Sequence, residues 1–104
     1  MNNLEETSFQ IISAAGESMS DMFQALRFAK EGKFIKSEEA MKKAQELLNK
    51  AHKAQTNLIV EEAQGKKTEY SIIMVHAQDH LMNCMLAKNL INELIEIYQK
   101  GNLV

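Results

Sequence analysis

Residues 72–98 have the sequence IIMVHAQDHLMNCMLAKNLINELIEIY, and this stretch decides what kind of fold the chain can adopt. Its apolar residues form two stripes at the three-and-four spacing of an α-helix. The first stripe contains Ile73, Ala77, Leu81, Met85, Ile91, Ile95 and Tyr98, and the second contains Ile72, Leu86, Leu90, Leu94 and Ile97. One stripe is enough for the core of a single chain, so the second predicts burial against another copy of the chain. We therefore expect a homo-oligomer.

The rest of the chain favours the same secondary structure. Its 104 residues are enough for one domain, and they include no proline and only four glycines, among many strong helix formers. We expect an all-α fold with a single domain over residues 1–104, an antiparallel three-helix bundle with helices at about residues 4–31, 34–64 and 68–100. The predicted inner faces of the first two helices comprise Leu4, Ile11, Ile12, Ala15, Met19, Met22, Phe23, Leu26 and Ala29, and Ala40, Met41, Ala44, Leu47, Leu48, Ala51, Leu58 and Ile59.

Capping residues indicate where these helices begin and end. Asn3 can cap the first turn, with Glu6 in the reciprocal capping position, and Gly32 is placed to end the first helix. Gly65 interrupts the pattern after the second helix, and Thr68 is expected to cap the third. Such short turns make consecutive helices antiparallel.

Charge and hydropathy exclude several classes of function. The formal net charge is −2, and the lysines alternate with glutamates instead of forming a basic block, so we expect no nucleic-acid partner. No apolar run reaches the roughly 20 residues of a membrane span, and residues 1–6 lack the features of a signal peptide. We expect a cytoplasmic protein without direct membrane insertion. The lone Cys84 has no neighbour in sequence that would activate its thiol, which indicates a packing role.

A cluster of polar residues interrupts the apolar pattern of residues 72–98. His76, Asp79 and His80 are spaced three and four residues apart, so on a helix their Cβ atoms lie about 5–6 Å from one another. Burying such groups without partners costs about 1–3 kcal/mol each, so a protein must satisfy or use them.

The residues alone leave three interpretations of this cluster open. The histidines are exposed or paired with Asp79 and have no further role, or His76 and His80 bind a transition metal, or His76 transfers a phosphoryl group or a proton. No glycine-rich phosphate loop or nucleophile elbow supports another enzyme class. His52 is expected to be a solvated or boundary residue. Gly16 and Ser20 could allow the first helix to approach the cluster, although helix packing is the simpler explanation.

The stretch from His76 to Met82, HAQDHLM, resembles the lactose/cellobiose (N,N'-diacetylchitobiose) type of enzyme IIA in the bacterial sugar phosphotransferase system. The resemblance continues through Met85-Leu86-Ala87 and residues 90–95, and backwards through residues 51–56, AHKAQT. It covers nearly the whole chain.

The resemblance implies a function for the cluster. His76 would accept a phosphoryl group from HPr and pass it to a cysteine of enzyme IIB, during uptake and phosphorylation of a β-linked disaccharide that this chain does not specify. It also implies a homotrimer, with one Mg²⁺ per trimer shared by Asp79 of three chains. His80 and Gln78 are expected to support the transfer. A non-catalytic helical adaptor and a metal-binding bundle are the rival hypotheses.

Overall fold

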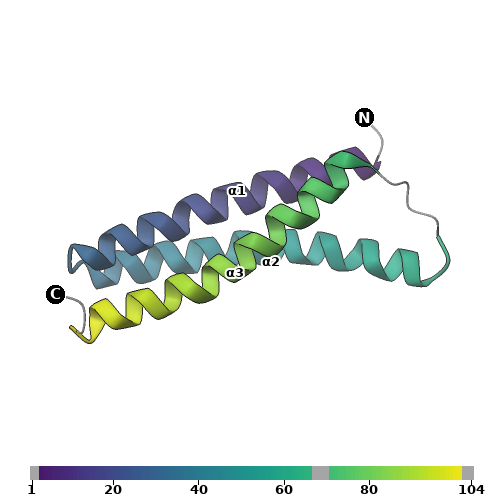
Figure 1. Cartoon of the computed structure of the whole chain (residues 1–104). Coiled ribbons are helices and arrows are strands. Elements are labelled where there is room, and N and C mark those ends of the chain that lie inside the picture. Colours follow the sequence, from purple (N-terminus) through teal and green to yellow (C-terminus); the bar gives the residue numbers. More distant parts are fainter. Residues whose placement is uncertain (1–2, 67–70, 102–104) are drawn as a thin grey trace.

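The computed structural model describes residues 3–66 and 71–101, which form three helices (Figure 1). Helix α1 spans Asn3–Lys30, α2 spans Phe34–Ala63 and α3 spans Ile72–Gln99. They form an elongated bundle of 52 × 23 × 19 Å in which α2 runs antiparallel to α1 and to α3. The described residues contain no strand, so the predicted all-α three-helix bundle is confirmed.

The turn between α1 and α2 depends on Gly32. Its φ of 75° lies in the left-handed region, which costs a residue with a Cβ atom but not glycine. In this conformation the Gly32 N–H donates to the carbonyl of Ala29 at 3.0 Å, and the Lys33 N–H donates to that of Phe28 at 2.8 Å. These two bonds form a Schellman motif, which ends the helix where the sequence predicted.

Helix α3 begins later than expected. Ser71 is its N-cap, and the Ser71 hydroxyl accepts a hydrogen bond from the backbone N–H of Met74 at 3.1 Å. Thr68, the predicted cap, lies outside the described residues, as does the side chain of Asn3. Both serine and threonine can cap a helix, so composition alone does not distinguish the two positions.

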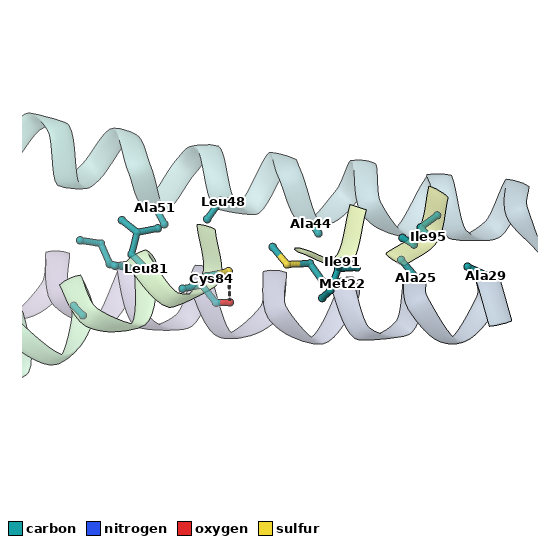
Figure 2. Close-up of a cluster of buried hydrophobic side chains, with 13 residues drawn as sticks. Met22, Ala25, Ala29, Ala44, Leu48, Ala51, Leu81, Cys84, Ile91 and Ile95 are labelled. Carbon is teal, nitrogen blue, oxygen red and sulfur yellow. Dashed lines mark hydrogen bonds between the residues drawn. The ribbon is translucent and has the colours of Figure 1, made fainter. Parts of the chain in front are cut away.

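The core follows one face of each helix, at the three-and-four spacing of an α-helix (Figure 2). Alanines are common in it, which lets the helix backbones approach closely. Helix α1 packs along both of the others, whereas α2 and α3 contact each other over a short stretch only. The buried apolar residues of α1 and α3 are Ile11, Ala15, Met22, Ala25 and Ala29, and Met74, Ala77, Leu81, Cys84, Ile91 and Ile95.

Buried serines connect α1 to α2. The Ser18 hydroxyl donates to the carbonyl oxygen of Ala44 at 2.7 Å, and the Ser37 hydroxyl donates to that of Ala25 at 2.8 Å. Both serines are fully buried and satisfied by these bonds. An apolar pattern cannot find them, because their burial depends on a carbonyl of another helix.

Two apolar residues were wrongly placed in the core. Phe23 is 47% exposed and Ile59 is 56% exposed, although the spacing assigned both to inner faces. Each directly follows a core residue, Met22 or Leu58, and is therefore rotated by about 100° around the helix from it, towards solvent. Among the described residues, no helix is long and apolar enough to cross a membrane.

The second apolar stripe of α3 faces outward. Ile72 is 90% exposed, Leu86 58% and Leu90 56%, while Leu94 is also exposed and Ile97 is partly so. No other part of the described chain covers this face. The two-stripe pattern is therefore confirmed within one chain, and an exposed apolar surface of this length is typical of an interaction site.

Candidate functional site

The two predicted histidines lie side by side on α3. The ring centroids of His76 and His80 are 5.8 Å apart, and their planes meet at 62° in an edge arrangement. The spacing of four residues brings them to neighbouring turns of one helix face. His76 is exposed, whereas His80 is half-buried. An incoming protein can therefore reach the first ring, while the second is partly enclosed by the bundle.

Asp79 occupies a different part of the surface. It is exposed and lies on the outward stripe of α3, between Val75 and Met82, which are each about half exposed. Within the described residues, no three His, Cys, Asp or Glu side chains come together as a set of metal ligands. A single chain therefore offers one carboxylate on an apolar face rather than a closed metal site.

Gln78 turns towards α2. Its Oε1 accepts a hydrogen bond from the Nε2 of Gln55, and its own Nε2 contacts the Sδ of Met74 at 3.5 Å. Gln55 is 8% exposed and Gln78 is half-buried, so this amide pair is partly removed from water. The pair is one of few links between α2 and α3, and it lies on the turn that carries the histidines. Spacing on one helix correctly separated Gln78 from the histidine face but could not identify Gln55.

The backbone of α1 lies close to the histidines at Ala15 and Gly16. A Cβ atom placed on Gly16 would be 4.0 Å from the Nε2 of His80. One turn further along α3, the Sγ of Cys84 donates to the carbonyl oxygen of Ala15 at 3.4 Å, the dashed line in Figure 2. Small residues therefore lie where α1 contacts α3 at this level, and Gly16 lies next to His80, which agrees with the less favoured of the two explanations offered for Gly16.

Burial controls the chemistry of Cys84. Desolvation raises the pKa of the Cys84 thiol above its ordinary value, and a contact with the Ser18 hydroxyl offsets only part of this effect. A thiol that stays protonated is a poor nucleophile. The packing role predicted for Cys84 agrees with its complete burial. His52 is exposed on α2, as expected.

Fold and site define a class of protein: a three-helix domain that presents an accessible imidazole beside a second, partly enclosed one. Residues 6–99 match the family described as the lactose/cellobiose-specific IIA subunit of the PTS system. The chain belongs to this family, and the resemblance found in the sequence is confirmed. It is thus similar to components of the bacterial phosphotransferase system.

Individual relatives agree with this assignment. The lactose-specific EIIA component of Staphylococcus epidermidis is 47% identical over 94 residues, which cover 90% of each chain. The crystal structure of the cellobiose-specific enzyme IIA from Bacillus anthracis is 47% identical, covers 98% of this chain and 94% of its own, and superposes with a TM-score of 0.93. The IIA(chitobiose) of Escherichia coli, solved in complex with HPr, is 40% identical with a TM-score of 0.83, over 99% of this chain and 100% of its own.

Proposed function

We propose that this IIA subunit is a phosphocarrier that accepts a phosphoryl group from HPr on His76 and passes it to a cysteine of enzyme IIB. The observation that carries the proposal is the exposed imidazole of His76, which has its neighbour His80 on the inner side. A relative solved as a complex with HPr supports the choice of donor. The substrate is a β-linked disaccharide, and its phosphorylation accompanies uptake on the cytoplasmic side of the membrane.

The chemistry needs few groups besides His76. A nitrogen lone pair of the neutral imidazole attacks phosphorus, and an N–P bond forms as the bond between phosphorus and its donor atom on HPr breaks. In the second step, the cysteine sulfur of enzyme IIB attacks the same phosphorus, and the N–P bond to His76 breaks. The Nε2 nitrogen is the proposed site of attachment, because it is the outer nitrogen of the ring.

His80 and Gln78 have supporting roles in this proposal. The phosphoryl group adds a charge of about −1.5 to −2, which needs donors nearby. A ring N–H of His80, one turn along the helix, supplies one. Gln78 acts indirectly: through Gln55 it holds this turn of α3 against α2.

We further propose that the working unit is a homotrimer built on the outward stripe of α3. The stripe combines exposed apolar residues over several turns, which is the pattern of a helix buried by other copies of its own chain. Assembly would cover it without disturbing His76, which lies at the margin of the stripe.

The residues of the stripe fit a divalent cation shared between chains. Asp79 is an exposed carboxylate among apolar side chains, so burying three copies of it together would require neutralisation. Mg²⁺ prefers carboxylate oxygens, and one Mg²⁺ per trimer, held by Asp79 of each chain, would supply positive charge there. The ion has a structural role, and no step of the phosphoryl transfer depends on it.

Incubation with phosphoenolpyruvate, enzyme I and HPr, followed by intact-mass measurement, tests the proposal. One phosphoryl group should be added per chain, and it should be lost in acid and retained in alkali, as expected of a phosphohistidine. A helical adaptor or a metal-binding bundle would remain unlabelled. An acid-stable label would contradict His76, because it would indicate a serine or threonine.

A further inference from the structure

Gly16 lies in the middle of α1, where nothing in the backbone requires a glycine. Unlike Gly32, it does not have a positive φ, and the helix continues on both sides of it. A glycine inside a helix is destabilising relative to alanine, because it loses more conformational entropy on folding. Its presence here therefore calls for a reason in the surroundings of the residue.

The imidazole of His80 lies next to Gly16. Among the described residues, the Nε2 of His80 is the one atom outside the local helix backbone that a Cβ on Gly16 would meet within 4 Å. The Cys84–Ala15 hydrogen bond holds α3 to α1 on the next turn, at the residue preceding Gly16. The two helices are thus in contact one turn away from His80, so a side chain at position 16 would occupy space next to the His80 ring.

We propose that Gly16 is a positioning residue for phosphoryl transfer, acting through His80; this inference rests on the proposed function of His76. The absence of a side chain lets the His80 ring lie against α1, with its edge arrangement towards His76 at a centroid distance of 5.8 Å. A methyl group would only touch Nε2, since 4.0 Å is an ordinary contact distance. A longer side chain must displace the ring and change its distance from a phosphoryl group on His76.

The test compares Gly16→Leu with Gly16→Ala and with the control Ser13→Leu, which places the same side chain at an exposed position of α1. The first readout is the NMR spectrum of the histidine rings. In Gly16→Leu the ring signals of His80 should move, while those of His52 on α2 stay in place. Thermal unfolding should show that all variants fold, because leucine and alanine are better helix formers than glycine.

The second readout is the rate of phosphoryl transfer from phosphorylated HPr. Gly16→Leu should lower it about 10- to 100-fold, the range typical for the loss of a supporting partner. Gly16→Ala should lower the transfer rate far less than Gly16→Leu, because a methyl group would only touch the ring at 4.0 Å. In a His80→Ala background, Gly16→Leu should have little further effect, because the two residues act through the same ring.

Several results would overturn the inference. One is that the NMR signals of His80 are unchanged in Gly16→Leu. Another is that these signals change while the transfer rate does not. A third is that Gly16→Leu lowers the transfer rate by the same factor in the His80→Ala background as in the wild-type protein. Failure of the proposed function is distinguishable, since the wild-type protein would then remain unlabelled. In that case the NMR comparison would show the contact with His80, but the positioning role would be refuted.

Discussion

The Sγ of Cys84 on α3 donates a hydrogen bond to the carbonyl oxygen of Ala15 on α1, across 3.4 Å. Both residues are completely buried, and their contact joins the two helices on the turn after His80 (Figure 2). Cys84 therefore has a structural role next to the candidate site. The rate at which reagents modify its thiol reports how tightly α1 and α3 are packed at this point.

Cys84 should react slowly with alkylating reagents in the folded protein. Burial raises the pKa of the Cys84 thiol and also blocks access, so at pH 8 iodoacetamide should modify it at least about 100-fold more slowly than in the unfolded chain. The unfolded chain loses its thiol proton first as pH rises. The free energy of unfolding should therefore fall above the ordinary thiol pKa of about 8.5, and Cys84→Ser should remove this part of the pH dependence. Rapid labelling of the folded chain would contradict the burial.

The three histidines should differ sharply in phosphoryl transfer. His76→Ala should abolish labelling by phosphorylated HPr, because it removes the proposed nucleophile. His80→Ala should remain labelled but lower the rate about 10- to 100-fold. His52→Ala is the matched control, since His52 is exposed on α2, and it should behave as wild type. Labelling of His76→Ala together with loss in either other variant would show that the acceptor is wrongly assigned.

A charge on the outward stripe of α3 should prevent assembly without unfolding the chain. Leu86 is 58% exposed in the single chain, so Leu86→Glu should keep the helical circular dichroism but shift the mass in light scattering from trimer to monomer. The control is Ile59→Glu on α2, where the exposed fraction is a similar 56%. A wild-type protein that is monomeric both with and without Mg²⁺ would refute the trimer.

Asp79→Leu should abolish metal binding without preventing assembly of the trimer. Replacing the carboxylate by an apolar side chain removes the proposed ligand and the repulsion between copies, so the trimer should persist and the ion should be lost. The melting temperature of the wild-type protein should rise with Mg²⁺ concentration, as for any ligand that binds the folded form, while that of Asp79→Leu should not. An equal response in both proteins would place the ion elsewhere.

The spacing of apolar residues and glycines predicted the secondary structure well, because the factors that determine a helix or a turn lie within each segment. The three-and-four spacing follows from helix geometry, and the turn at Gly32 follows from the freedom of glycine at positive φ. The same spacing predicted the burial of individual residues less well. It placed Phe23 inside and gave no hint that Ser18 is buried, because each outcome depends on which atoms of another helix are present.

The sequence by itself determined the arrangement of the histidines. His76 and His80 are four residues apart on one helix, so the distance between their Cβ atoms is a property of that helix alone. The outward stripe of α3 follows in the same way, from two apolar faces on a segment that one bundle can cover on one side only.

Only the tertiary structure decided what surrounds these histidines. The contact of Gly16 with His80, the hydrogen bond of Cys84 to Ala15 and the pairing of Gln78 with a buried glutamine of α2 all join residues from different helices. Such contacts depend on the axial register and separation of the packed helices. These are set by the complementary fit of many small core side chains at once, and no periodicity within a single segment contains that information.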